Sequence, residues 1–123
     1  LGVEDVMLKT NIEKLTIMAA GSAHPHATEL LASRGMDLLL DELAQRYHDR
    51  VVIFDSPPLL MTSEARVLAT QMGQIVLVVE AEKTTQQMVK ETLRQIESCV
   101  NVDLIYNKAR EFSDDNYFGY YYS

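Results

Sequence analysis

The stretch RVVIFDSPPLL, at residues 50–60, decides how this chain can fold. Four apolar residues at 51–54, mostly β-branched, predict a short strand buried on both faces of a parallel sheet. Pro57 and Pro58 cannot continue a ladder, so we expect the strand to end before them. Asp55 then lies at the carboxyl edge of the sheet, where open α/β sheets bind ligands. An acid there can hold Mg²⁺ against nucleotide phosphates, although Asp55 could instead cap a turn or a helix.

The composition indicates one globular domain. The chain has 123 residues, of which 47% are apolar and 24% charged, and that size is sufficient for a hydrophobic core. A net charge of -7 without a Lys/Arg cluster argues against nucleic acid as a partner. Cys99 is the single cysteine, so it has no internal disulfide partner and fits a reducing compartment. The apolar runs are short, and we expect no membrane span or signal peptide in this piece.

Strand and helix patterns alternate along the rest of the chain. Such alternation predicts parallel strands joined by right-handed crossovers, hence a layered α/β sheet flanked by helices. The expected elements are a loose helical spacing at 1–8, a buried strand at 15–20, a helix from 27 or 28 to 33, an amphipathic helix at 36–47, a helix from 62 or 63 toward 73, a strand at 74–80 buried on both faces, a helix from 84 or 85 to 96, and a strand at 102–106.

A loop with two histidines follows the expected strand at 15–20. His24 and His26 stand two residues apart and could share a metal ion. Local spacing supplies no third ligand, and a protein zinc site needs at least three. We therefore predict no metal site at these histidines.

Several short motifs carry a family resemblance. The sequence DSPP at 55–58 resembles the Walker B motif of P-loop NTPases, in the form shared by MinD/ParA-like ATPases and bacterial tyrosine kinases. The segments ELLAS at 29–33, YNKA at 106–109 and DDNYFGYYYS at 114–123 match the bacterial tyrosine kinases as well. From Leu15 to its end, the chain resembles the C-terminal portion of such a kinase, of the exopolysaccharide-associated autokinase type.

The resemblance implies a fold, an activity and a set of site residues. It implies a P-loop NTPase-like fold of the MinD/ParA type, with residues 1–110 as the C-terminal part of the kinase domain and 111–123 as a flexible tail. The domain would transfer the γ-phosphoryl group of ATP to tyrosines. Asp55 matches the catalytic Mg²⁺ ligand, and Asn107 and Lys108 match residues beside the nucleotide base. The matching phosphate acceptors are Tyr117, Tyr120, Tyr121 and Tyr122.

The tyrosine cluster suits an acceptor segment on physical grounds. Gly119 and the polar residues around it favour a mobile terminus that can reach an active site. The alternative, an aromatic edge strand packed on the core, is less favoured because exposed aromatic clusters are rare. The resemblance further implies other copies of the kinase as partners, with tails phosphorylated in trans. It also implies a membrane activator or polysaccharide export component, and a cytoplasmic location at the inner face of the membrane.

Three elements of the family do not occur in these 123 residues: a G-x-x-x-x-G-K-[ST] phosphate loop, a second acidic motif and an N-terminal Arg-containing segment. We expect the chain to lack the N-terminal part of the domain and to be inactive alone. Two alternatives stay open. One is a fragment of a MinD/ParA-like ATPase, against which the tyrosine tail argues, and the other is a non-enzymatic module that a separate kinase phosphorylates.

Overall fold

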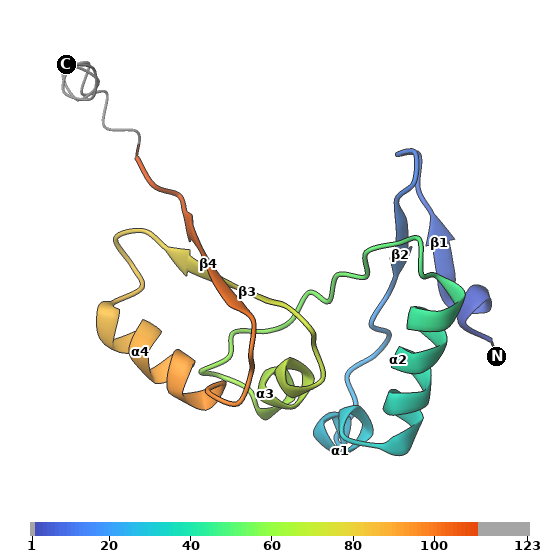
Figure 1. Cartoon of the computed structure of the whole chain (residues 1–123), viewed down its shortest axis with the longest axis horizontal. Helices are drawn as coiled ribbons and strands as arrows, with labels where there is room; N and C mark the ends of the chain where they lie inside the picture. The colour runs from blue at the N-terminus through green and yellow to red at the C-terminus, as the bar shows by residue number, and fades with distance from the viewer. Residues whose placement is uncertain (1, 111–123) are drawn as a thin grey trace. The chain divides into compact units, whose positions relative to one another are not determined.

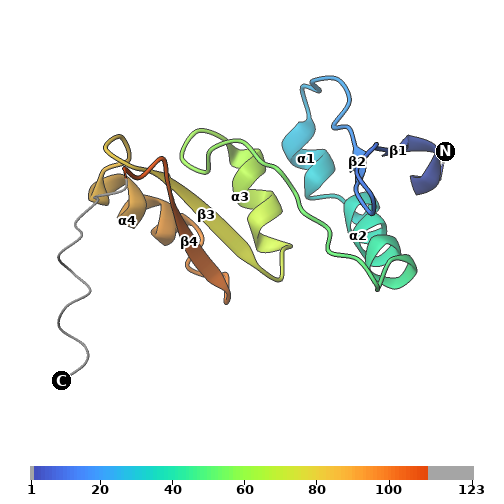
Figure 2. The same ribbon diagram turned by 90° about the horizontal axis from the view of Figure 1, so that it is seen from above.

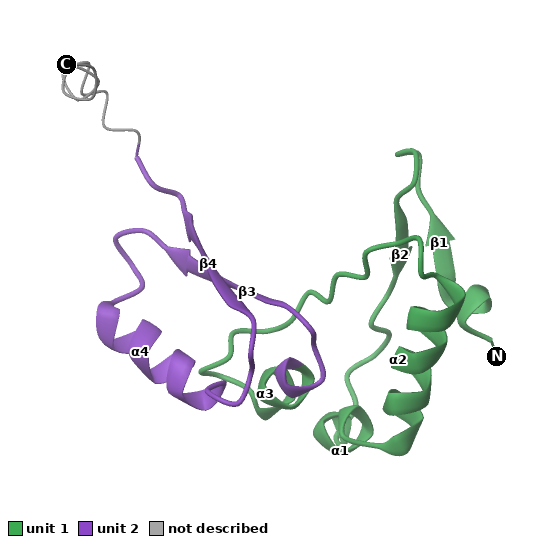
Figure 3. Ribbon diagram, in the orientation of Figure 1, with its two compact units in different colours: residues 1–68 green, residues 69–123 purple. Residues whose placement is uncertain are grey.

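A computed structural model describes residues 2–110 of the chain (Figure 1). The chain divides into two compact units, with the boundary between Leu68 and Ala69 (Figure 3), and each unit is described by itself. No helix within residues 2–110 is long and apolar enough to cross a membrane. The predicted boundary between a domain at 1–110 and a tail at 111–123 coincides with the limit of the described residues and stays a prediction.

The first unit begins with a hairpin. A 3₁₀ turn at Val3–Val6 leads into β1, Met7–Lys9, which pairs antiparallel with β2, Thr16–Met18, so that Leu8 lies opposite Ile17. The loose helical spacing expected at 1–8 is met only by the 3₁₀ turn at Val3–Val6. The strand expected at 15–20 is confirmed as β2, but its expected parallel arrangement is wrong. The physical reason is local. Thr10 closes a short turn, since its hydroxyl donates to Leu15 O at 2.9 Å. Closing this short turn costs less conformational entropy than closing the long crossover that parallel pairing would need.

Three helices complete the first unit where the apolar periodicity predicts them. They are α1 at Ala27–Leu31, α2 at Arg34–Arg46 and α3 at Ser63–Thr70, which contains the unit boundary. Ser33 begins α2, because its Oγ accepts a hydrogen bond from Met36 N at 3.4 Å. Leu43 is buried on the inner side of α2. These helix predictions are confirmed to within a few residues.

The segment at 51–54 corrects our expectation of a buried strand. It is irregular, and Val51 and Ile53 are 88% and 85% exposed. A strand buried on both faces needs a paired neighbour and a layer on each side. Within residues 2–110 no strand pairs with this segment, so the segment does not become the central strand that its apolar residues predict. Asp55 is consequently exposed in an irregular segment and does not end a strand.

The second unit is a strand-helix-strand motif. β3, Ile75–Glu80, and β4, Val102–Asn107, pair in parallel with Ile75 opposite Val102 and Glu80 opposite Asn107. Between them runs α4, Gln86–Gln95, which lies along one face of the two strands (Figures 1 and 2). Thr85 begins α4 by accepting a hydrogen bond from Met88 N at 3.2 Å. The predicted strand order and parallel pairing are confirmed here.

Burial in the second unit is one-sided. Ile96, at the end of α4, is 1% exposed, whereas Val76 and Val78 of β3 are about half exposed. Alternate residues of a strand point to opposite faces, and the structure covers only the face beside α4. The prediction that 74–80 is buried on both faces is therefore wrong, because within residues 2–110 the sheet has one covering helix in this unit.

The burial pattern makes a prediction about stability. Ile96→Ala should lower the free energy of unfolding by about 2–5 kcal/mol, since it leaves a cavity in the core. Ile53→Ala is the matched control and should change it by less than about 0.5 kcal/mol, because that side chain is in solvent. Urea denaturation of the chain measures both values. Equal losses for the two variants would contradict the exposure of residues 51–54.

Candidate functional site

The carboxyl ends of β3 and β4 form the candidate site. Glu80 ends β3 and Asn107 ends β4, and the two residues are register partners. The chain stays paired just beyond them, because Ala81 N donates to Asn107 O at 2.9 Å. Asn107 and Lys108 thus lie at the edge where parallel α/β sheets bind ligands, as the sequence predicts for their position. We call this region, residues 80–84 and 107–110, the carboxyl edge.

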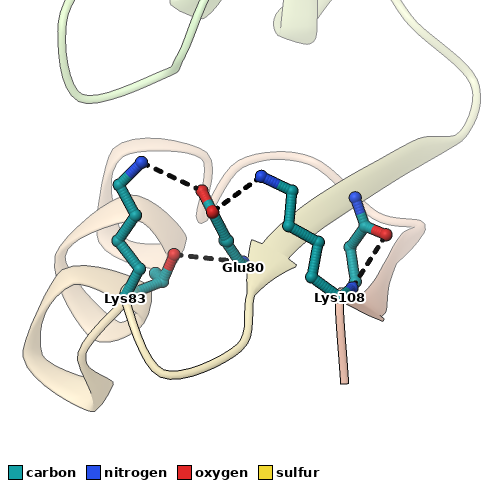
Figure 4. A network of polar contacts seen from close by, with 5 residues as sticks. Glu80, Lys83 and Lys108 are labelled. Atoms are coloured by element: carbon teal, nitrogen blue, oxygen red, sulfur yellow. Dashed lines mark hydrogen bonds and ion pairs between the residues drawn. The ribbon is translucent and has the colours of Figure 1, made fainter. Parts of the chain in front are cut away.

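A carboxylate joins the two loops of the carboxyl edge. Glu80 Oε1 accepts from Lys108 Nζ at 2.8 Å, and Glu80 Oε2 lies 3.2 Å from Lys83 Nζ (Figure 4). The backbone of Glu80 is fixed too, since its N–H donates to Thr84 Oγ1 at 3.1 Å. Sequence reasoning missed Glu80 and Lys83. Glu80 could have been identified from the sequence, because it is an acid at the end of a β-branched run, as is Asp55.

Both loops of the carboxyl edge contain a left-handed residue that is not glycine. Lys108 has φ 57° and Glu82 has φ 61°, a conformation that costs an ordinary side chain about 1–2 kcal/mol. Local contacts offset this cost. Lys108 N donates to Asn107 Oδ1 at 2.9 Å, and Arg110 lies 3.8 Å from the Glu82 carboxylate. The edge is thus held by contacts between and within the loops that follow β3 and β4.

The charges at the edge favour an anionic or acceptor-rich ligand. The hydrogen bond from Lys108 lowers the pKa of Glu80 below its ordinary value of 4.5, and the hydrogen bond from Lys83 lowers it further. Glu80 is therefore ionised at neutral pH. One carboxylate between two ammonium groups leaves one positive charge in excess at this point of a chain that is acidic overall.

An open hollow of about 400 Å³ adjoins the carboxyl edge, between α4 and the strands. Its lining is mainly apolar, so it suits a ring or an apolar side chain better than a polyphosphate. Its lining residues are Val79, Thr84, Gln86, Val89, Lys90 and Tyr106.

The other predicted site residues lie elsewhere. Asp55 belongs to the first unit, and its exposed carboxylate is a chemically suitable donor for Mg²⁺, which accepts one carboxylate together with phosphate oxygens. The predicted acceptors Tyr117, Tyr120, Tyr121 and Tyr122 lie outside the described residues. In the first unit, the rings of His24 and His26 lie 5.8 Å apart.

Comparisons with known proteins identify relatives along most of the chain. It is 28% identical to tyrosine-protein kinase YwqD of Bacillus subtilis over 121 residues, which is 97% of this chain and 50% of YwqD. It is 33% identical to tyrosine-protein kinase CpsD of Streptococcus pneumoniae over 89 residues, 70% of this chain and 38% of CpsD. The crystal structure of the chimerical protein CapA2B2 matches with a TM-score of 0.72 and 30% identity, over 85% of this chain and 47% of that protein.

The chain spans half or less of the length of each of these three proteins. No family model matches it. The match to the solved structure at this TM-score supports the α/β assignment for the chain.

The lowered pKa of Glu80 makes a prediction about pH. A carboxyl whose folded-state pKa is depressed stabilises the fold above its unfolded pKa, and that contribution is lost as the pH falls through the folded value. Glu80→Gln should therefore lower the melting temperature of the chain at pH 7, and the difference from wild type should shrink once the pH falls below 4.5. Thermal unfolding between pH 7 and pH 3 measures this.

High salt at pH 7 provides a second test. Salt screens the partly exposed ion pair of Glu80 with Lys108, so it should reduce the difference in melting temperature between Glu80→Gln and wild type. A melting difference that stays constant from pH 7 to pH 3 would contradict the assigned interaction.

Proposed function

Because the chain belongs to the bacterial tyrosine kinases, we propose that it forms the C-terminal part of a P-loop kinase domain. The domain would use Mg²⁺ and ATP to phosphorylate tyrosines in other copies of the same kinase. The observation that carries this proposal is the carboxyl edge, where parallel pairing brings Asn107 and Lys108, at the end of β4, beside Glu80 at the end of β3.

The proposed reaction is phosphoryl transfer to a phenol. The bond between the γ-phosphorus and the bridging oxygen of ATP breaks, ADP leaves, and a tyrosine oxygen bonds to phosphorus and loses its proton to solvent. Catalysis of this kind depends on positioning and charge neutralisation. Asn107 and Lys108 would lie at the nucleotide base, and Asp55 would hold Mg²⁺, which neutralises phosphate charge when it is bound.

The proposed acceptors are the four tyrosines of the terminal cluster. Each phosphate adds about -1.5 to -2 charges at neutral pH, on a chain that already has a net charge of -7. Repulsion should then drive a phosphorylated tail away from its docking site. This provides a switch between associated and dissociated copies of the kinase, if tails are phosphorylated in trans.

The same proposal extends to cellular context. The family to which the chain belongs supports a role in regulating exopolysaccharide synthesis or export, with a membrane activator or an export component as partner. The domain would act in the cytoplasm at the inner face of the membrane, through that partner or through a further N-terminal region.

A labelling experiment tests the proposed function. The 123-residue chain is incubated with Mg²⁺ and labelled ATP, alone and with complete YwqD, and the label is measured on the 123-residue chain only. We expect label only when YwqD is present, because this chain contains no phosphate loop. Replacing Tyr117, Tyr120, Tyr121 and Tyr122 by Phe should abolish the label.

The matched control replaces the other two tyrosines of the chain, Tyr47 and Tyr106, by Phe and should retain the label. Label on the chain without YwqD would refute its inactivity alone. Absence of label in both reactions would refute the acceptor role of the cluster.

A further inference from the structure

Glu80 is not among the residues that the sequence motifs single out, yet it contacts both loops of the carboxyl edge. We infer that Glu80 is a positioning residue, which holds Lys108 so that Asn107 alone donates to the nucleotide base. This inference rests on the proposed function. It assigns different roles to two neighbouring residues, Asn107 as the direct contact and Lys108 as its support.

The ion pairs direct the Lys108 side chain across the edge. Its ammonium group lies 2.8 Å from Glu80 Oε1, while Lys83 lies 3.2 Å from the other oxygen. Figure 4 shows both lysines reaching the same carboxylate from opposite sides. Both oxygens of Glu80 are thus engaged, and its side chain is only 31% exposed. The Lys108 ammonium group is therefore already paired with a protein carboxylate.

The Asn107 amide is left with donors for a ligand. Its Oδ1 accepts from Lys108 N at 2.9 Å. Within residues 2–110, its Nδ2 group donates to no protein acceptor. An amide with its oxygen occupied and its N–H groups open is suited to an acceptor on a ligand, such as a ring nitrogen of a purine base.

The left-handed turn at Lys108 couples these two observations. At φ 57°, Lys108 donates its N–H to Asn107 Oδ1 and its side chain reaches Glu80. A lysine has no intrinsic preference for this conformation. The ion pair with Glu80 and the Asn107 hydrogen bond offset its cost, so loss of Glu80 should loosen the turn and with it the orientation of the amide.

A double-mutant cycle in the complete protein that contains this chain tests the inference. The variants are Glu80→Gln, Lys108→Gln and the double variant, and the measurement is kcat and KM for Mg-ATP. If Lys108 acts only through Glu80, each single variant should raise KM about three- to fivefold with kcat within about twofold of wild type. These magnitudes fit a partly exposed ion pair, and the double variant should match either single one.

The matched control is Glu91→Gln. Glu91 pairs with Arg94 on α4 at 3.3 Å, so this variant also removes an exposed ion pair of the second unit, and it should leave both constants unchanged. A double variant whose KM rises by the product of the two single effects would overturn the inference, because Lys108 would then contact the nucleotide directly. Unchanged kinetics for Glu80→Gln would overturn it as well.

If Glu80→Gln lowers the melting temperature without changing KM, Glu80 has only a structural role and the inference is overturned. Failure of the proposed function is distinguishable, since the wild-type protein would then neither bind ATP nor transfer phosphate. In that case, nuclear magnetic resonance of the 123-residue chain still tests whether Glu80 sets the orientation of the Asn107 amide. Glu80→Gln must shift the side-chain amide resonances of Asn107, and unshifted resonances would overturn the inference.

Discussion

The parallel pairing of β3 and β4, extended past its end by the Glu80 carboxylate, is the interaction on which the candidate site depends. Register brings Glu80 and Asn107 side by side, and the Ala81–Asn107 hydrogen bond continues the ladder into the loops. The ion pair with Lys108 then fastens the second loop to the first. This ion pair and the hydrogen bond from Lys108 N to Asn107 Oδ1 are the two contacts that offset the cost of the left-handed turn at Lys108.

Exposed apolar surface is the second feature that bears on function. Val51 and Ile53 of the first unit, and Val78 and Ile105 of the second, all have more than half of their surface in solvent. Within each unit, such exposed apolar side chains are suited to packing against another protein surface. Under the proposed function, these side chains would pack against other parts of the kinase domain, consistent with a chain that spans half or less of its relatives.

Local signals in the sequence predict much of the second unit. The β-branched run at 75–80, the cap at Thr85 and the periodicity of α4 each depend on nearby residues, and the structure confirms all three. The position of Asn107 at the end of a parallel strand follows from the same alternation. The β-branched run, the helix cap and the apolar periodicity are each visible within a few neighbouring residues, which explains why sequence patterns suffice to predict these elements, although β3 still pairs with the distant β4.

Two errors have a common physical cause. The strand expected at 51–54 and the double-sided burial expected for β3 both require packing partners far away in the chain. An apolar pattern predicts that a segment is buried, but it does not identify the segment that packs against it. The ion pair of Glu80 with Lys108 joins residues 28 positions apart, so it follows from strand register and no local motif contains it. For this reason the family resemblance points to Asn107 and Lys108, whereas no motif points to Glu80, which pairs with Lys108.

Native-state hydrogen exchange at the Ala81 amide tests the central claim most directly, because that amide bonds to Asn107 O just beyond the last residue of β3. If the two loops are fastened together, Ala81 should be protected nearly as well as the β3 amides that pair with β4, and Glu80→Gln should reduce its protection while sparing the middle of β3. An Ala81 amide in the wild-type chain that exchanges as fast as an unstructured loop would contradict a fastened carboxyl edge.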